Sequence, residues 1–475
     1  MDAEWFGLKL VVRSLFAITV IAMMISMVHA QPPTLLWSDP TVETVDIKLS
    51  RDGNYVVVAS FQIGDGFGGQ VRFYSRSSGT PLWTWSSGTF FSVAISEHGD
   101  YVAASGLVDG TPVVVYWKNA RAPTVTPRPP DWTSNNLFGV IERRNLALSD
   151  DGNFMVACGT GSNVYYWAGM NGRSDSEKSA TWSWGARGAV LAVDISGDGD
   201  YVAAGTSAPS VAYWKNARSL GPGNVNPNWE STSPDHAVID VAVSDDGDYV
   251  AAASGPLVDL SVHYWAGAKS LAGDPPNTWY YGADVPFTSV DMSCDGDSVI
   301  AGAGVLLTLA EAGAGVAVAA APANGPISGS VYFWGGAQSL TGTPSPTWVY
   351  PTDHPIWDVA INDAGTYMAA VDASIPDTVY FFNRQGNLLW QDITIGGDKL
   401  SISCDGGTLA VGTPTFRTAY LFDTGYSSPC CGAGPVGGVV STPSGALVTI
   451  APYLALAVIA GAAAVIVVFA TRRRA

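Results

Sequence analysis

Charged residues are scarce in this chain, and histidine and cysteine are scarcer still. Only 13% of the 475 residues are charged, and there are five histidines and five cysteines. The 23 lysines and arginines, against 41 acidic residues, leave no basic face of the kind that nucleic acid requires. No Asn-x-Ser/Thr sequence occurs, so N-linked glycans are not expected. Nucleic acid is therefore excluded as a partner.

The sequence also lacks motifs of catalytic or metal-binding residues. The histidines of the mature chain, His98, His236, His263 and His354, are scattered and form no pair at metal-ligand spacing. No Ser/His/Asp order, Gly-rich phosphate loop or pair of catalytic carboxylates stands out. We therefore predict no catalytic, cofactor-binding or metal-binding residue, and a protein that is not an enzyme. His263, which shares a strand position with Tyr165 and Tyr332, is interpreted as a seam residue between sheets.

What the chain has in abundance is an internal repeat. A segment close to Val-Ala-Ile-Ser-x-Asp-Gly-Asp-Tyr-Val-Ala-Ala-Gly recurs eight times, mostly at intervals of 41 to 53 residues. A period of this length with short strands is typical of β-propeller blades. The copies are centred on Gly53, Gly99, Gly152, Gly199, Gly247, Gly296, Gly365 and Gly406.

One repeat contains four short strand patterns. In residues 190–230 they lie at 190–196, 201–205, 211–214 and around Trp229. Such a set forms one antiparallel blade that needs neighbours to bury both of its faces. We interpret Asp-rich segments such as 196–200 as hairpin turns, because a strand follows where a calcium loop would need a further carboxylate. The turns should share one face, where Lys118, Arg121, Lys215, Arg218 and Lys269 from neighbouring loops would offset their charge.

The tryptophans of the fourth strands indicate how the ring closes. Seven repeats are each followed by one, but the eighth, Trp37, precedes the first repeat. The sequence therefore predicts an all-β, eight-bladed propeller of four-stranded antiparallel blades over residues 31–423. The strand around Trp37 should complete the last blade, because chain from both ends then ties the ring shut.

These motifs resemble two propeller families. The run at 241–252, followed by Val-His-Tyr-Trp at 262–265, resembles WD-repeat blades, although the Trp-Asp dipeptide and the Gly-His pair are missing. Ser-Gly-Thr-Pro-Leu-Trp (78–83) and Gln-Gly-Asn-Leu-Leu-Trp (385–390) resemble the repeats of quinoprotein-like propellers, which often have eight blades. The second resemblance implies an alternative function, a quinoprotein-like oxidoreductase or another propeller enzyme with its site at the ring centre.

Both ends of the chain carry targeting patterns. Residues 1–30 are typical of a signal peptide, with Lys9 and Arg13 before an apolar stretch and a small-residue cleavage site. Residues 446–470 contain no charge and are long enough to span a bilayer. The basic tail 471–475 should be cytoplasmic, with the propeller on the extracytoplasmic side of the cell membrane. Residues 424–445, rich in Gly, Ser and Pro, are predicted to form a flexible stalk.

Two further segments are candidate interaction sites. Cys430 and Cys431 are adjacent in the expected stalk, and a bridge between protomers, a vicinal disulfide and lipidation all remain open for them. Cys294 and Cys404, in equivalent places two blades apart, are too distant to bridge each other. The sixth repeat carries an insertion at 304–329 with one charge, Glu311. It is interpreted either as a packed hairpin or as a partner contact, whose residues would be Val305, Leu306, Leu307, Leu309, Val316 and Val318.

Together these patterns favour a propeller anchored at the cell surface by one C-terminal membrane helix. We expect a non-catalytic protein-interaction or structural module of the envelope, with a protein partner at the cell surface. Two alternatives stay open, namely the propeller enzyme described above and an extracellular sensor or ligand-binding domain.

Overall fold

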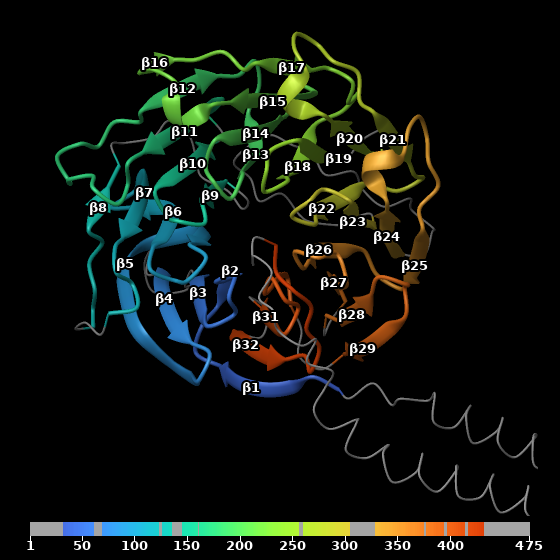
Figure 1. Ribbon diagram of the computed structural model, residues 1–475. Coiled ribbons are helices and arrows are strands. Elements are labelled where there is room, and N and C mark those ends of the chain that lie inside the picture. The colour runs from blue at the N-terminus through green and yellow to red at the C-terminus, as the bar shows by residue number, and fades with distance from the viewer. Residues whose placement is uncertain are drawn as a thin grey trace, which may run out of the picture. The chain divides into compact units, whose positions relative to one another are not determined.

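The computed structural model describes residues 32–60, 69–122, 126–134, 145–159, 161–255, 260–304, 328–374, 377–393, 397–413 and 417–431. Within these ranges the chain is almost entirely β-sheet, with three short 3₁₀ helices at Ala217–Ser219, Ala268–Ser270 and Ala337–Ser339. The sheets stand side by side around a central axis as a β-propeller (Figure 1). The predicted all-β propeller is confirmed.

Seven sheets make up this ring in the described part of the chain. The first sheet along the chain has seven strands: β2 (Thr44–Leu49), β3 (Tyr55–Ser60), β4 (Gly69–Ser75), β5 (Ser78–Ile95), β6 (Val102–Val108), β7 (Thr111–Trp117) and β8 (Trp132–Thr133). The next contains β9 (Leu146–Leu148), β10 (Phe154–Gly159), β11 (Asn163–Ala168), β12 (Trp182–Gly185) and the short β16 (Gly223–Asn224).

The remaining five sheets have four strands each. They are β13 (Val190–Ile195), β14 (Tyr201–Thr206), β15 (Ser210–Lys215) and β17 (Trp229–Ser231); β18 (Val238–Val243), β19 (Tyr249–Ser254), β20 (Ser261–Ala266) and β21 (Trp279–Gly282); β22 (Phe287–Met292), β23 (Ser298–Gly304), β24 (Gly329–Gly335) and β25 (Trp348–Thr352); β26 (Ile356–Ile361), β27 (Tyr367–Asp372), β28 (Val379–Asn383) and β29 (Leu388–Asp392); and β30 (Lys399–Ile402), β31 (Thr408–Thr413), β32 (Thr418–Asp423) and β1 (Thr34–Asp39).

The 18-residue strand β5 explains the seven-stranded sheet. Its first part pairs with β4 as far as Gly88, and its second part pairs with β6 from Thr89 onward. One continuous strand therefore serves as the outer strand of one four-stranded unit and the inner strand of the next.

The N-terminal strand closes the ring. β1 pairs antiparallel with β32, with Trp37 opposite Leu421. The Trp37 side chain is nearly buried, stacks on Tyr74 at 5.0 Å between ring centroids and donates through Nε1 to the Arg76 carbonyl at 3.1 Å. The predicted pairing of the first strand with the last is confirmed.

The repeated Asp-Gly segments are hairpin turns, as predicted. In the copy at 196–201, Ser196 Oγ donates to Asp198 Oδ1 at 2.7 Å, and the Tyr201 amide donates back to Ser196 Oγ at 3.0 Å. Gly199 has a φ of 76°, which a residue with a side chain rarely adopts. The carboxylate thus serves the turn itself rather than a calcium ion.

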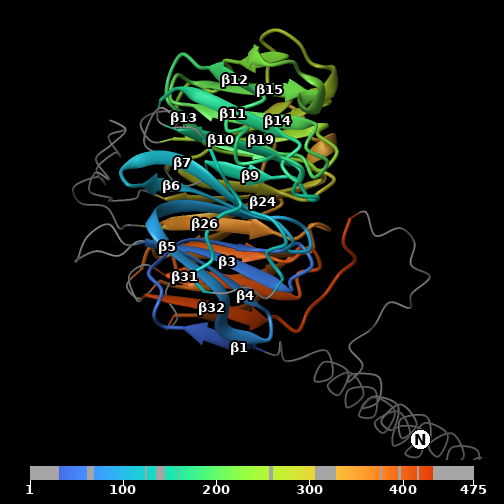
Figure 2. The ribbon, with the colours of Figure 1, turned by 90° about the vertical axis from the view of Figure 1, so that its left-hand side faces the viewer.

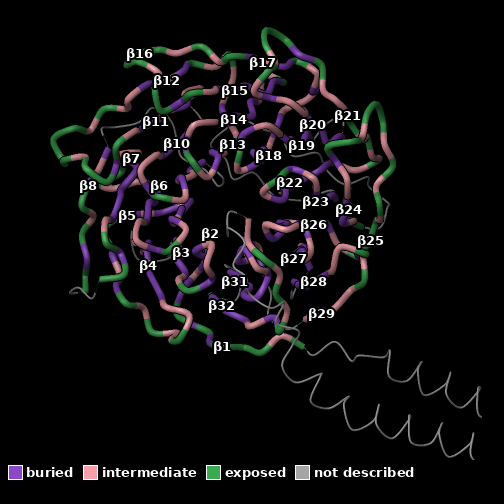
Figure 3. The backbone as a smooth tube through the Cα atoms, in the orientation of Figure 1, coloured by how far each residue is buried: buried purple, intermediate pink, exposed green. Residues whose placement is uncertain are grey.

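Aromatic residues join neighbouring sheets, as expected from their placement in the repeats. Trp182 stacks on Tyr166 within its sheet (4.8 Å) and contacts Trp214 of the next sheet (5.5 Å). Trp182 Nε1 donates to the Ala217 carbonyl at 3.0 Å, and the Tyr166 hydroxyl donates to the Gly199 carbonyl at 2.7 Å. Buried residues run along the strands, whereas exposed ones collect at the outer edge and in connecting loops (Figure 3).

Several expected segments fall outside the described residues. These are the signal peptide at 1–30, the span at 446–470, the tail at 471–475, and the insertion residues Val305, Leu306, Leu307, Leu309, Val316 and Val318. Among the residues that the structure does describe, no helix has the length and apolar character needed to cross a membrane.

Candidate functional site at the ring axis

The inner strand of each unit faces the axis, and its polar residues follow a simple rule of position. Each inner strand leads into a repeat turn, and inward-pointing residues lie four and two places before the first residue of that turn. In β2, for example, Asp46 and Lys48 precede Ser50 at these two places. Because side chains alternate along a strand, the two positions share one face and form two tiers around the axis.

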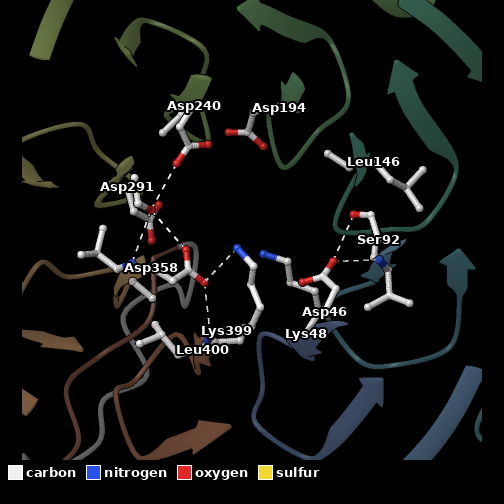
Figure 4. Close-up of a pocket in the computed structure, with 18 of the residues that line it drawn as sticks. Asp46, Lys48, Ser92, Leu146, Asp194, Asp240, Asp291, Asp358, Lys399 and Leu400 are labelled. Carbon is white, nitrogen blue, oxygen red and sulfur yellow. Dashed lines mark hydrogen bonds and ion pairs between the residues drawn. The ribbon is translucent and has the colours of Figure 1, made fainter. Parts of the chain in front are cut away.

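These tiers line a cavity of about 300 Å³ (Figure 4). Charged side chains line it from six inner strands: Asp46 and Lys48 from β2, Asp194 from β13, Asp240 from β18, Asp291 from β22, Asp358 from β26 and Lys399 from β30. Ser92, Ser289 and Ser401 add hydroxyl groups. The ring centre is thus polar and carries more carboxylates than amines.

The axial carboxylates hydrogen-bond to the next inner strand around the ring. Asp46 Oδ2 accepts from the Val93 amide at 2.9 Å and from Ser92 Oγ at 3.0 Å. Asp240 Oδ2 accepts from the Val290 amide at 2.9 Å in the same way. An inner strand has no β-ladder partner on its axial side, so its inward amides would otherwise lack acceptors.

The second tier repeats this arrangement two residues further along. Asp194 Oδ2 accepts from the Val243 amide at 2.8 Å, and Asp291 Oδ2 accepts from the Ile361 amide at 3.0 Å. Burial raises the pKa of Asp194 and that of Asp291 to about 7, although these backbone bonds oppose the shift. Both carboxyls therefore exchange protons near neutral pH.

One end of the axis, on the face of the repeat turns, is closed by a charge cluster. Arg51, whose side chain is 15% exposed, donates to Asp150, Asp245 and Asp363, which come from three other turns around the ring. Burial raises the pKa of Asp150 to about 6, against the opposing effect of Arg51. The turns are also linked to one another by backbone bonds, for example Glu97 N to Asp150 O at 2.9 Å.

The end of the described chain covers this cluster. Cys431 is disulfide-bonded to Cys294, in the turn after β22, and Cys430 to Cys404, in the turn after β30. The Cys431 amide donates to Asp363 Oδ2 at 3.3 Å, so the segment touches a partner of Arg51 directly. Figure 2 shows the chain after β32, in red, along one face of the ring.

Disulfide bonding is one of the possibilities that the sequence leaves open for Cys430 and Cys431, but their partners are cysteines of the ring. The pair does not lie in a free stalk, because the chain stays packed on the ring through Cys431. Cys430 and Cys431 form no vicinal disulfide, because each is bonded to a cysteine in a different sheet. Neither is left as a thiol for lipidation or for a bridge between protomers. Spacing along the chain could not reveal this, since the bridged residues are 137 and 26 positions apart.

Three side chains in this region lie close enough together to bind a metal ion. Ligand atoms of Asp363, Cys404 and Cys430 lie within 4.8 Å of one another. Both sulfurs belong to one disulfide, and metals bind thiolates rather than disulfide sulfur. When oxidised, Cys404 and Cys430 therefore hold the end of the described chain against the turn face rather than bind a metal.

The remaining predicted residues have structural roles. His263 is buried, Ser261 Oγ lies 2.8 Å from its Nε2, and burial lowers its pKa to about 4, so it is a neutral core residue as expected. On the turn face, Arg121, Arg218 and Lys269 lie 2.5, 3.2 and 3.3 Å from turn aspartates, which confirms the local charge offset for these three. The Nζ atoms of Lys118 and Lys215 donate to backbone carbonyls instead.

Sequence reasoning missed the axial residues. No carboxylate of the two tiers was singled out, nor was Arg51, because each looks like an isolated polar residue in an apolar run. Their common signal is their position relative to the turn in each repeat. The eight repeats can be aligned on the serine or asparagine that begins each turn. The strand positions four and two residues before it then carry charged side chains in several repeats.

Comparison with known proteins supports the fold and leaves the function open. No protein-family model matches the chain, and no curated protein matches its sequence. Sqt1 from Chaetomium thermophilum, in a crystal structure bound to the N-terminus of the ribosomal protein L10, matches with a TM-score of 0.60 and 15% identity. The match covers 82% of this chain and all of that one. This likeness supports the β-propeller fold, and that fold hosts many unrelated activities.

Proposed function

We propose that this chain is a non-catalytic protein-interaction module, displayed at the cell surface on a C-terminal anchor. The two disulfides are the observation that carries the proposal. Four of the five cysteines are paired, and such bonds persist in oxidising compartments outside the cytosol. They support the secretory signal expected at residues 1–30.

The ring in this proposal has eight blades. The seven-stranded sheet divides at β5 into two four-stranded units, and the other six sheets supply one unit each. Eight units also match the eight sequence repeats, each of which contributes one turn around the axis. The short β16 is an added edge pairing on β12 rather than a further unit.

The disulfides also set the length of the proposed stalk. They hold the chain at the axis of the turn face, from which it continues as residue 432. If 446–470 spans the membrane, then 432–445 is the stalk, with a reach of roughly 20 Å by random-coil scaling.

The axial groups support a non-catalytic role. Asp46, Asp240 and Asp358 accept hydrogen bonds from inner-strand amides, so their first task is to hold neighbouring units together. The insertion 304–329, which lies between β23 and β24, remains our candidate for the partner contact.

A cross-linking experiment on the full chain in native membranes tests the proposal. Replacing residues 304–329 with a short Asn-Gly hairpin should remove the principal cross-linked partner and leave the ring folded. A matched variant in which a Gly/Ser sequence of equal length replaces the insertion separates apolar character from loop length. An impermeant amine reagent should label the ring in intact cells.

Two results would contradict the proposal. Protection of the ring lysines in intact cells, with labelling only after lysis, would exclude display at the surface. Uptake of pyrroloquinoline quinone and calcium by the purified chain, with turnover measured by dye reduction, would identify an enzyme instead.

A further inference from the structure

Most outer strands of the ring are covered by chain from the next unit. The contact is made at the residue that follows the outer-strand tryptophan. In β17, for example, the Glu230 amide donates to the Gly273 carbonyl at 2.9 Å. The same position is bonded in β5, β8, β12 and β21, where the partners are Arg128, Asp175, Val225 and Gly342. Five outer strands are thus covered in the described part of the chain.

Three of these covers share a chemistry. The segments on β12, β17 and β21 run parallel to the strand that they cover. Each contacts the strand at a glycine with positive φ, namely Gly223, Gly273 and Gly342. A proline follows within the next four residues in each case. An extended segment with glycine and then proline is therefore what this ring places on its own outer edges.

The outer edge of β29 has no such cover (Figure 1). Gln391, which follows Trp390, occupies the position of Glu230, and within the described residues no backbone bond reaches it from outside its sheet. The segment after β32 would be expected to supply the cover, because it follows the third strand of the next unit. That segment turns to the axis instead, where Cys430 and Cys431 are disulfide-bonded.

Trp390 is also the exception among the outer-strand tryptophans. The others donate Nε1 to a carbonyl of the next unit at 2.9 to 3.1 Å, and they are Trp37, Trp83, Trp132, Trp182, Trp229, Trp279 and Trp348. Among the described residues, Trp390 Nε1 has no acceptor.

The ring of Trp390 is less enclosed as well. Trp229 and Trp279, on covered strands, are 1% and 0% exposed, whereas Trp390 is partly exposed. Its cross-strand neighbour Phe381 contacts Tyr426 of the segment after β32, at 5.9 Å between ring centroids. Trp390 therefore keeps a hydrogen-bond donor and apolar surface for a partner.

We propose that the outer edge of β29 binds an extended, glycine- and proline-containing segment of a partner protein. The segment runs parallel to β29, accepts from the Gln391 amide and places a carbonyl on Trp390 Nε1. Extended peptides add to open sheet edges in this way, and tryptophan is enriched among the residues that dominate binding energy. Ile393, which follows β29 and is 58% exposed, supplies apolar contact at the same edge.

A different protein fits this edge better than a second copy of the chain. Two copies of β29 related by a two-fold axis would pair antiparallel, whereas the covers on β12, β17 and β21 are parallel. The glycine-containing covers of the described chain are already engaged on their own ring. The inference rests on the proposed role as an interaction module, but the contact is separate from the insertion 304–329.

Synthetic peptides that copy the ring's own covers test the inference on the purified full chain in detergent. The probes are capped peptides of residues 270–277 and 339–346. With ¹⁵N-labelled tryptophan, the indole NMR signal that Trp390→Phe removes should shift downfield as either peptide is added. We expect a Kd of about 1 mM or below, measured by anisotropy of the fluorescein-labelled peptide. The Gly342→Val peptide should bind roughly fivefold more weakly, because valine disfavours positive φ.

Backbone variants of the ring locate the contact. Gln391→Pro removes the outward amide and should weaken either peptide about tenfold, whereas Gln391→Ala keeps the amide and should leave the affinity unchanged. Val349→Pro makes the same change at the corresponding position of β25 and is the matched control, with no effect expected on the Trp390 signal. Circular dichroism and the melting temperature show that each variant is folded.

Three results would overturn the inference. Neither peptide moves the Trp390 signal, Gln391→Ala weakens binding as much as Gln391→Pro, or light scattering shows a dimer that Gln391→Pro dissociates. The last result would assign the edge to a second copy of the chain. These measurements use the purified chain with its insertion intact, so their failure is distinct from a failure of surface display or of the cross-linked partner.

Discussion

At the residue scale, Gly197 is the clearest case of a side chain that must be absent. It occupies the turn position that is Arg51 in the first repeat and Asp150 in the third. A Cβ built at residue 197 would lie 2.5 Å from Asp150 Oδ2, well inside any real contact. The missing side chain leaves room for the Asp150 carboxylate to reach Arg51.

We expect Gly197→Ala to destabilise the ring by about 1–3 kcal/mol, because the methyl group displaces Asp150 from Arg51. Chemical denaturation with a fluorescence readout from the tryptophans measures this loss. Gly221→Ala is the matched control, since a Cβ there meets nothing within 4 Å. Equal stabilities for the two variants would mean that the Arg51 cluster rearranges at no cost.

At the element scale, the inner strands face a problem that is common to propellers. Each has a ladder partner on one side only, because no strand of the described sheets lies on the side that faces the axis. The carboxylates of Asp194 and Asp291 supply acceptors for the Val243 and Ile361 amides. Their burial has a cost, which appears as the rise of their pKa values to about 7.

This cost predicts a pH dependence of stability. An acid whose pKa is higher in the folded chain than its ordinary value of 3.8 binds protons more strongly when folded. Its contribution to stability is complete below about pH 4 and is lost as the pH rises through about 7. The ring should therefore melt a few degrees higher, roughly 2–5 °C, at pH 5 than at pH 8.

The double variant Asp194→Asn, Asp291→Asn identifies the source of that dependence. An amide cannot titrate, so the difference between the melting temperatures at pH 5 and pH 8 should shrink by at least half. Buried His263, whose lowered pKa acts in the opposite sense below about pH 6, is unchanged in both chains. A difference that is the same with and without the two acids would refute this assignment.

At the scale of the whole molecule, the ring depends on one pairing between the chain's ends. β1 and β32 are joined by backbone bonds, and Trp37 is packed with Tyr74 and Leu421. Without β1 the last unit would lose its outer strand and expose the edge of β32. The Arg76–Asp423 ion pair at 2.7 Å also lies beside this seam.

Deleting residues 32–39 should therefore lower the melting temperature by roughly 5 °C or more, because the loss of Trp37 burial alone is worth about 3–5 kcal/mol. Differential scanning calorimetry measures the change. Trp37→Ala should reproduce most of it if side-chain packing dominates, and little of it if the backbone pairing does. A deleted chain that melts at the parental temperature would show that the ring closes without this strand.

Particular residues show how far prediction from sequence extends. The glycine of each turn, the aromatic pairs and Trp37 could be interpreted because their effects are local or periodic. Asp291 and Lys399 could not, because their meaning depends on which strands face each other across the axis. The bonds of Cys430 and Cys431 were missed for the same reason, since composition alone makes 424–445 look like a free stalk.

The repeat and the antiparallel units could be predicted from the chain alone, because they follow from strand periodicity and turn chemistry within about 50 residues. The closure could be predicted because Trp37 is the one fourth-strand tryptophan that precedes its repeat. Which residues meet at the axis depends instead on how the whole ring folds. Circular closure brings together residues from six strands hundreds of positions apart, and it surrounds Arg51 with carboxylates from three different turns. A site built from such long-range neighbours leaves no contiguous motif in the chain, which is why the candidate site appeared only once the ring was closed.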